Sequence, residues 1–256
     1  MDLSADIAAV VTGGASGLGE ATARMLAAGG ARVAIFDMNE EAGQAVASDI
    51  GGSFVKVDVA DHESVAAGFA AARAAHGQER VCVTCAGVGW AARTVDREGK
   101  AHDPGLFAKI VSINLIGTFN VASQAAAGMQ AAAPVDRDGS RGLIVMTASV
   151  AAFDGQIGQA GYAASKAGVA GMTLPMARDL SRAGIRVNTI APGLFLTPML
   201  KGLPEEAQAS LGAQVPFPAR LGDPSEYALL VRQFIENGML NAAVIRLDGA
   251  IRMAPK

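Results

Sequence analysis

Tyr162 and Lys166 lie four residues apart in the chain, and Ser149 precedes the tyrosine by thirteen residues. On a helix, residues four apart share one face, so the phenol and the ammonium would project together. A positive charge nearby lowers the pKa of a tyrosine, which suits the phenol to exchange a proton with a substrate oxygen. A serine hydroxyl beside it can hold that oxygen by a hydrogen bond. These residues predict an acid/base site for an alcohol or a ketone, although Tyr-x-x-x-Lys also arises by chance.

The chain opens with an expected strand, a glycine-rich turn and a helix. Residues 7–12 form a short apolar run, and Gly13, Gly17 and Gly19 precede a segment rich in helix formers. Glycines let the backbone approach a pyrophosphate closely, and the helix N-terminus offers free N–H groups to that anion. The pattern Gly-x-x-x-Gly-x-Gly differs from the strict Gly-x-Gly-x-x-Gly, but it predicts the same kind of dinucleotide site.

An acidic residue follows the second expected strand, residues 31–36. Asp37 lies eighteen residues after Gly19, near the spacing at which a carboxylate binds the adenosine ribose hydroxyls of a dinucleotide. Because a carboxylate there would repel a 2′-phosphate, we expect NAD and not NADP as the cofactor. The plainer alternative is a solvated aspartate at the end of a strand.

Length and composition indicate a single α/β domain over residues 1–256. The 256 residues are 51% hydrophobic and 18% charged, which disfavours disorder and suffices for a sizeable core. A net charge of −3, without a run of Lys or Arg, argues against a nucleic-acid partner. We expect no apolar stretch to reach the length of a membrane span, and the N-terminus resembles neither a secretory signal nor a transit peptide. We therefore expect no membrane partner and a cytoplasmic location.

The two cysteines form Cys82-x-x-Cys85, a spacing found in redox pairs and in half of many zinc sites. Residues 80–85 are expected to form a buried strand, on which residues three apart face opposite sides. No second Cys/His pair completes a ligand set, so we expect no metal. The three histidines are scattered and are interpreted as surface residues: His62, His76 and His102.

Apolar strands alternate with helical stretches along the chain, which predicts a doubly wound, Rossmann-type parallel sheet. The further strands are expected over residues 53–57, 80–85, 142–147, 185–190 and 243–247. Helices are expected over residues 61–76, from about 104 to 130, and from the Tyr162 region to about 182. In such sheets ligands bind beyond the carboxyl ends of the strands. Six residues at these ends therefore indicate one site: Gly13, Asp37, Asp58, Gly87, Ser149 and Gly193.

Together these motifs resemble those of the short-chain dehydrogenase/reductase family over essentially the whole chain. The family's Pro-Gly turn corresponds to Pro192-Gly193 and its helix asparagine to Asn114, beside the glycine turn and the Ser-Tyr-Lys set. The resemblance implies that Tyr162 is the acid/base and that Lys166 tunes it and binds the nicotinamide ribose. It also implies that Asn114 joins a proton relay through water to Lys166. The alternative for Asn114 is an amide that satisfies nearby backbone groups.

The resemblance is strongest to family members that act on 3-hydroxyacyl-CoA. It rests on residues 147–153, 191–195, 214–218 and 246–253 and on a polar insertion at 93–103. It further implies a homotetramer, for which the sequence itself offers two long Ala-rich helices. Thr197 would bind the carboxamide of the cofactor, or cap a helix starting at Pro198. The implied NAD contacts are Gly13, Ser16, Gly17, Leu18, Gly19, Asp37, Asp58, Val59, Cys85, Ala86, Gly87, Tyr162, Lys166, Pro192, Gly193, Phe195 and Thr197.

We therefore expect reversible, NAD-dependent oxidation of a secondary alcohol, specifically (S)-3-hydroxyacyl-CoA, to the ketone. Ser149 would orient the substrate oxygen beside Tyr162, with Gln156 and Gln159 as further substrate contacts and residues 194–216 as a lid. One alternative is another alcohol or ketone: a hydroxysteroid, a 3-oxoacyl carrier or a xenobiotic alcohol. The other is a non-catalytic scaffold subunit.

Two residues leave open questions. Trp90 lies just past the expected cofactor loop, where it either narrows the substrate mouth or simply packs. Thr84 stands where the family commonly has Asn, and its hydroxyl cannot reproduce both functions of an amide. We expect a local adjustment of the sheet there and no loss of catalysis.

Overall fold

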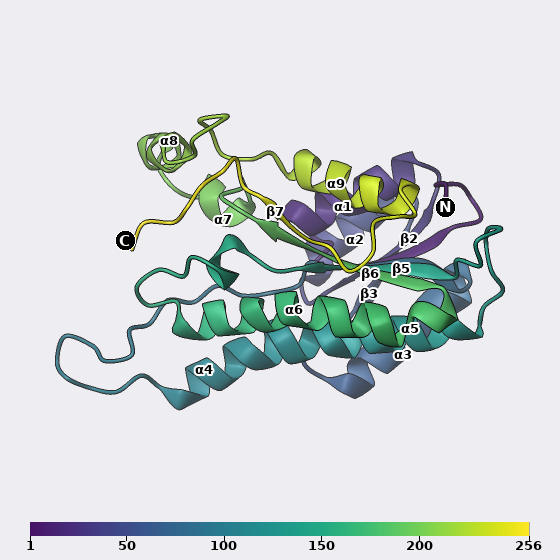
Figure 1. Ribbon diagram of the computed structural model, residues 1–256, viewed down its shortest axis with the longest axis horizontal. Helices are drawn as coiled ribbons and strands as arrows, with labels where there is room; N and C mark the ends of the chain where they lie inside the picture. The colour runs from purple at the N-terminus through teal and green to yellow at the C-terminus, as the bar shows by residue number, and fades with distance from the viewer. Residues whose placement is uncertain (256) are drawn as a thin grey trace.

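Seven segments form one parallel sheet in this computed structural model (Figure 1). They are β1 Ala8–Thr12, β2 Arg32–Asp37, β3 Ser53–Lys56, β4 Glu79–Thr84, β5 Gly142–Thr147, β6 Ile185–Pro192 and β7 Val244–Leu247. The strand order is β3-β2-β1-β4-β5-β6-β7, with every neighbouring pair parallel. The reversal of order between β1 and β4 confirms the expected Rossmann-type topology. The structure describes residues 1–255, apart from the side chain of Met199; Lys256, the last residue of the expected domain, lies outside them.

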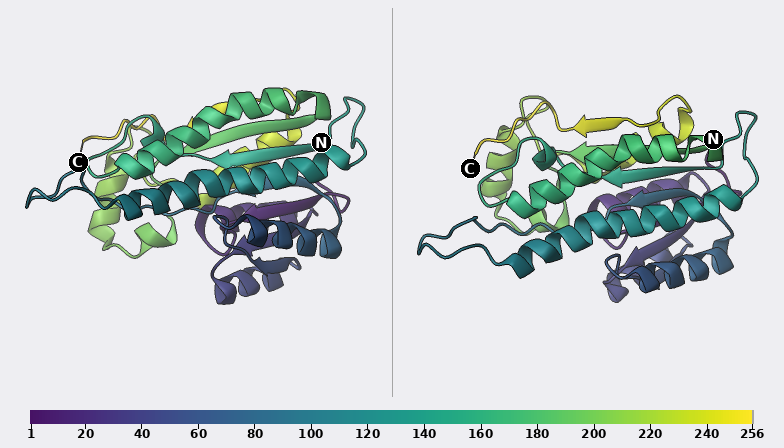
Figure 2. Two further views of the ribbon diagram at one scale, coloured as in Figure 1. Left: turned by 90° about the horizontal axis from the view of Figure 1, so that it is seen from below. Right: turned by 60° about the horizontal axis from the view of Figure 1, so that its bottom comes forward.

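Helices cover both faces of the sheet (Figures 1 and 2). One face carries α1 Gly17–Ala28, α2 Glu40–Asp49 and α9 Pro224–Glu236. The other carries α3 His62–His76, α5 Gly117–Ala131 and α6 Ala160–Asp179. This arrangement buries both faces of the strands, which explains why they are nearly continuous apolar runs.

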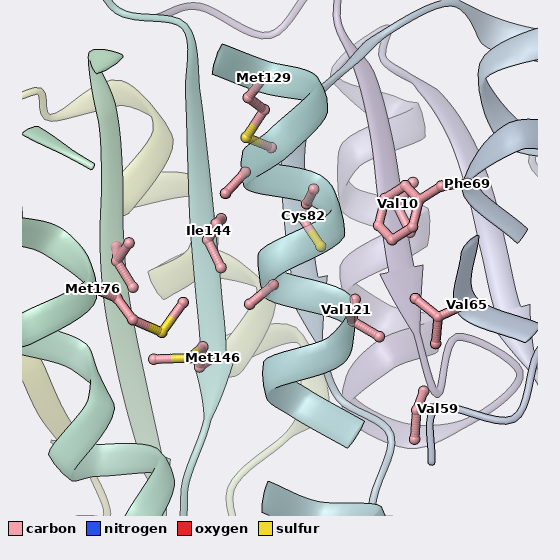
Figure 3. Packing of buried hydrophobic residues seen from close by; sticks show 14 of the residues in the cluster. Val10, Val59, Val65, Phe69, Cys82, Val121, Met129, Ile144, Met146 and Met176 are labelled. Atoms are coloured by element: carbon pink, nitrogen blue, oxygen red, sulfur yellow. The ribbon is translucent and has the colours of Figure 1, made fainter. Parts of the chain in front are cut away.

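Each face of the sheet has its own apolar core. In Figure 3, Val121 and Met129 of α5 lie against the strand residues Cys82 and Ile144. The opposite core packs α1, α2 and α9 onto the alternate residues of the same strands. Burial of one such side chain contributes about 1.5–3 kcal/mol, so the sheet is a rigid support for the residues at its edges.

A 28-residue helical rod, Pro104–Ala131, crosses the molecule beside α6 (Figure 2). It consists of α4 Pro104–Val111, the π-helical turn Ser112–Ile116 and α5. By length and composition this rod could cross a membrane, which contradicts the expectation that no apolar stretch is long enough. The rod packs along the sheet and against α3 and α6, however, so we interpret it as a core helix.

Three helices, α2, α8 and α9, were not anticipated from the sequence, although α2 and α9 carry start signals. The Asn39 side chain accepts a hydrogen bond from Ala42 N at the start of α2. Helix α9 begins with a capping box between Asp223 and Glu226, with Pro224 in its first turn. Each signal follows the standard chemistry of a helix N-terminus.

The expected lid is a closed loop with two short helices, α7 Pro198–Lys201 and α8 Glu205–Ala213. A single β-bridge between Phe195 and Gly222 joins the two ends of the loop at its base. The loop that this bridge closes runs from Phe195 to Gly222, and its action as a substrate lid over residues 194–216 stays a prediction. After the last strand, β7, the C-terminal tail continues at the same end of the sheet.

The cysteines and two of the histidines have defined surroundings. Cys82 lies in the core under α5 and Cys85 packs toward the opposite core, which confirms that the two thiols face opposite sides. His62 is exposed, and His76 and His102 are partly exposed, so all three histidines reach the surface as expected. His76 Nε2 lies 2.8 Å from Ser53 Oγ. Within residues 1–255, no three His, Cys, Asp or Glu side chains cluster as metal ligands would.

Thr84 keeps its place in the sheet without a partner for its side chain. Strand β4 pairs in register with β1 and β5 through Thr84. Its Oγ1 is buried and has no hydrogen-bond partner among the described residues. The register of both ladders is therefore regular at Thr84, so the expected local adjustment of the sheet is not seen there, and the hydroxyl is left unsatisfied.

Candidate active site

The carboxyl ends of the strands open into a cavity of about 400 Å³. The C-terminal tail, α7, α8 and the 93–103 insertion gather at the same end of the molecule, on the left in Figure 1. Twelve of the predicted site residues line this cavity: Leu18, Cys85, Gly87, Ser149, Gln156, Gln159, Tyr162, Lys166, Pro192, Gly193, Phe195 and Thr197. The sequence thus identified most of the residues that meet here.

Lys166 reaches the site from the buried face of α6. Its Nζ donates a hydrogen bond to the main-chain oxygen of Thr147, 2.9 Å away at the end of β5. The same atom lies 5.8 Å from the centroid of the Tyr162 ring. Burial lowers the pKa of Lys166 to about 8, because desolvation disfavours the ammonium.

The surroundings of Tyr162 differ from the expectation that Lys166 lowers its pKa. Burial raises the pKa of Tyr162, and a hydrogen bond with Ser149 opposes that effect. The Ser149 Oγ also accepts a hydrogen bond of 3.1 Å from Ala151 N, which fixes the turn that follows β5. Ser149 is therefore the group that favours the phenolate in this structure.

The glycine turn brings α1 close to the end of β4. Gly13 has a φ of +65°, and a Cβ there would lie 2.7 Å from Ala86 N. A Cβ on Gly19 would lie 2.2 Å from the carbonyl oxygen of Gly13. Among the described residues no side chain caps α1, so its first N–H groups remain available to an anion. These features fit the phosphates of a dinucleotide.

The two predicted aspartates flank that turn differently. The Asp37 carboxylate accepts hydrogen bonds from Ala15 N at 3.1 Å and Asn39 N at 2.9 Å. It therefore lies directly beside the glycine turn, where a ribose would follow the phosphates. Asp58 is exposed and caps Ala60 N, while the adjoining Val59 is buried beneath Gly117 of α5.

Asn114 is fully buried in the π-helical turn and binds the loop after β4. Its Oδ1 accepts from Val88 N at 2.8 Å, and its Nδ2 donates to Val88 O at 2.9 Å and Ser165 Oγ at 3.1 Å. A Cβ on Gly87 would lie 3.1 Å from Asn114 Oδ1 and 3.4 Å from Lys166 Nζ. The side chain thus satisfies nearby backbone groups, and the water relay to Lys166 stays a prediction.

The two glutamines line the cavity with their amides already engaged. Gln156 N donates to Gln159 Oε1 at 3.0 Å, and Gln156 Nε2 donates to Ala254 O at 3.0 Å. These bonds fasten the C-terminal tail to the loop before α6. The tail places Met253 in the cavity wall.

Several cavity residues were not predicted as site residues. Trp90 lines the cavity and also packs against Lys109, whose Nζ lies 5.3 Å from its ring centroid. Its packing role is therefore seen, and its narrowing of the substrate mouth stays a prediction. Thr147 could have been found as the residue two before Ser149, at a strand end. Met253 carries no local signal, because its position depends on the path of the tail.

Comparisons with known proteins identify the family. A family model described as short chain dehydrogenase matches residues 7–208. The chain is 52% identical over 249 residues to the 3-hydroxyacyl-CoA dehydrogenase type-2 of Drosophila melanogaster, covering 96% of this chain and 97% of that one. It is 51% identical over 252 residues to the human protein of the same name, covering 97% and 96% of the two chains.

A solved structure agrees with these matches. The crystal structure of 3-hydroxyacyl-CoA dehydrogenase type-2 from Mycobacterium avium aligns with a TM-score of 0.94 and 48% identity over 98% of both chains. The chain belongs to the short-chain dehydrogenase family, whose members use NAD or NADP. The predicted family, fold and class of enzyme are thereby confirmed.

Proposed function

We propose that this dehydrogenase oxidises (S)-3-hydroxyacyl-CoA to 3-oxoacyl-CoA with NAD, reversibly. The observation that carries the proposal is the convergence of Ser149, Tyr162 and Lys166 in one cavity beside an uncapped α1 and Asp37. The relatives named for 3-hydroxyacyl-CoA, at about half identity over nearly the whole chain, support the substrate class.

Each residue of the site has a distinct role in this proposal. The Tyr162 hydroxyl exchanges a proton with the substrate oxygen, and Ser149 orients that oxygen by a hydrogen bond. The Lys166 ammonium positions the nicotinamide ribose. Asn114 holds the Val88 loop and, through water, continues the proton path. NAD, when bound, supplies the acceptor for the hydride.

The cofactor part of the proposal rests on Asp37. A carboxylate beside the glycine turn accepts ribose hydroxyls and repels a 2′-phosphate. The other residues that would hold the dinucleotide come from the glycine turn, the ends of β3, β4 and β6 and the base of the lid: Gly13, Ser16, Gly17, Leu18, Gly19, Asp58, Val59, Cys85, Ala86, Gly87, Pro192, Gly193, Phe195 and Thr197. An Asp37→Ser variant should lose most of the preference for NAD, measured as the ratio of kcat/KM for NAD and NADP. An unchanged ratio would contradict the assignment.

The deciding experiment measures NADH formation from (S)-3-hydroxybutyryl-CoA, beside its R isomer, simple secondary alcohols and a hydroxysteroid. We expect the S thioester to have the highest kcat/KM. Preference for a simple alcohol or steroid would agree with dehydrogenase activity but would contradict the proposed acyl-CoA substrate.

A second variant tests the acid/base assignment independently of the substrate. In Tyr162→Phe, turnover should fall by about 10²-fold or more, because the group that exchanges the proton with the substrate oxygen is gone. Nucleotide affinity, measured by calorimetry, should stay close to that of the wild type. Retained turnover would rule out Tyr162 as the acid/base.

We also propose that the protein assembles as a homotetramer. The support is a set of exposed apolar side chains on the rod and α6, on the sides turned away from the sheet: Phe107, Ile116, Phe119 and Leu174. Large apolar side chains exposed on neighbouring helices favour burial against another molecule, so a second copy is the occupant that we propose.

A further inference from the structure

A ring of three hydrogen-bonding side chains lies directly behind the cavity. It consists of Cys85 after β4, Thr147 at the end of β5 and Tyr227 on α9, here called the Cys85–Thr147–Tyr227 ring. Thr147 Oγ1 lies 2.7 Å from Tyr227 OH and 3.6 Å from Cys85 Sγ. Cys85 Sγ lies 3.7 Å from Tyr227 OH. If Thr147 donates to Cys85, Cys85 to Tyr227 and Tyr227 to Thr147, each group donates once and accepts once.

Tyr227 is fully buried. Its exposed fraction is 0%, and its ring packs in the core between α9 and the sheet. Burial raises the pKa of Tyr227 well above its usual value, so the phenol remains a neutral hydroxyl. A buried hydroxyl requires a partner, and Thr147 is the partner at normal hydrogen-bond length.

Thr147 connects the two faces of the sheet. Its side chain points toward α9, where it meets Tyr227. Its main-chain oxygen accepts the hydrogen bond from Lys166 Nζ, which comes from α6 on the other face. A contact that fixes the orientation of Thr147 therefore also fixes its main-chain oxygen, which accepts the hydrogen bond from the Lys166 ammonium.

The same ring supports the floor of the cavity. Cys85 and Thr147 both line the cavity, while Tyr227 lies behind them and does not belong to its described lining. Tyr227 thus contacts two side chains that would face the cofactor, but Tyr227 itself does not face the cavity.

We infer that Tyr227 is a positioning residue for the reaction: through Thr147 it sets the place of the Lys166 ammonium and of the wall on which the nicotinamide lies. This inference rests on the proposed function, since it assigns the nucleotide to this cavity. The inference adds a residue from α9, a helix that contributes no side chain to the described lining of the cavity.

The test removes the hydroxyl alone, in Tyr227→Phe, which keeps the ring in the core. We expect the Kd for NAD to rise and kcat to fall, each by about three- to tenfold, the range that one hydrogen bond covers. The KM for the alcohol should stay within about twofold, because the substrate side of the cavity is formed by other elements. Binding is measured by calorimetry and turnover at saturating NAD.

A matched control separates positioning from stability. Thr173 Oγ1 on α6 lies 2.7 Å from Thr189 Oγ1, and both residues are fully buried away from the cavity. Thr173→Val therefore removes an equally short, equally buried contact. It should lower Tm comparably while leaving Kd and kcat unchanged. Tyr227→Phe behaving in the same way would overturn the inference.

Two variants of Thr147 keep the test decisive even if Tyr227→Phe fails to fold. Thr147→Ser retains the hydroxyl and should retain NAD affinity, whereas Thr147→Val should lose it as Tyr227→Phe does. Adding Tyr227→Phe to Thr147→Val should cause no further loss, because both remove the same contact. Full additivity would contradict action through Thr147.

The outcomes also distinguish this inference from the proposed function. Equal NAD affinity in wild type and Tyr227→Phe overturns only the role of Tyr227. A wild-type protein that binds neither NAD nor NADP overturns both. If the enzyme proves not to oxidise the acyl-CoA substrate, the inference about Tyr227 still holds, since nucleotide affinity does not depend on which alcohol is oxidised.

Discussion

Lys166 keeps its amino group inside the protein with a main-chain carbonyl as its partner. Its side chain is almost fully buried, and Thr147 O is the acceptor. The desolvation that lowers its pKa to about 8 makes the ammonium unfavourable in the folded state relative to water. The protein thus stabilises the Lys166 ammonium only partly, as expected for a group that binds a ligand.

This gives a pH dependence of stability with a defined sign. Lys166 titrates near 8 when folded and near 10.5 when unfolded, so between these values the unfolded chain binds more protons. The buried ammonium therefore destabilises the fold less as pH increases from about 8 to 10.5, and its contribution to the free energy of unfolding rises. The free energy of unfolding of wild type relative to Lys166→Met should rise over that range, measured by urea denaturation. A constant difference would contradict the buried ammonium.

Thr84 offers a prediction about stability alone. Its unpartnered, buried hydroxyl costs about 1–3 kcal/mol, so Thr84→Val, which has the same shape, should raise Tm by several degrees. Activity should not change. A lower Tm would mean that the hydroxyl has a partner, as in the control Thr173→Val, where a formed hydrogen bond is lost.

Among the elements, the C-terminal tail is attached to the active site by ionic contacts. The Arg246 guanidinium on β7 pairs with Asp154 in the loop before α6 and with Asp248 at the start of the tail. It also donates to Ile251 O, two residues before Met253 in the cavity wall. The tail thereby closes one side of the substrate region.

An Arg246→Met variant should loosen that wall. Asp154 loses its ionic partner and Asp248 keeps only Arg252, so we expect the free energy of unfolding to fall by about 1–3 kcal/mol and the substrate KM to rise severalfold. NAD affinity should be unchanged. The control is Arg232→Met on α9, whose surface pair with Glu236 should contribute little. Equal effects of the two variants would contradict the role of the tail.

The elements also show what local sequence could predict. All seven strands were expected within a few residues, because buried parallel strands are continuous apolar runs between turn residues. Gly13, Asp37 and Ser149 followed from their places at strand ends. The position of Met253 and the bridge at Gly222 were not predictable, since each depends on pairings between distant segments. Lys166 lies beside the Tyr162 ring as expected, but burial raises the pKa of Tyr162, and Ser149, not Lys166, opposes that effect.

For the whole molecule, the exposed apolar face on the rod and α6 has a consequence for assembly. Phe119 and Ile116 are each 48% exposed on adjacent turns. We expect Phe119→Glu to shift the protein from tetramers to smaller species in analytical ultracentrifugation, because a buried carboxylate would lack a partner at the interface.

The control for assembly is Val135→Glu, which changes an exposed apolar residue in the loop between α5 and β5. That variant should sediment as the wild type does. Dissociation should also lower Tm and make it depend on protein concentration, since the partner copy stabilises the fold by mass action. Unchanged sedimentation of Phe119→Glu would place the interface elsewhere.

The rod has a further consequence while the chain is being made. Residues 104–131 leave the ribosome before β5 and β6, two of the three strands that cover α5. Until those strands follow, an apolar segment with the dimensions of a membrane span stays uncovered, open to aggregation and to the cell's insertion machinery. Asn114 and Asn120 make that segment a poorer candidate for insertion, because amides are costly in hydrocarbon. The asparagine that shapes the active site thus also helps to keep the nascent chain in water.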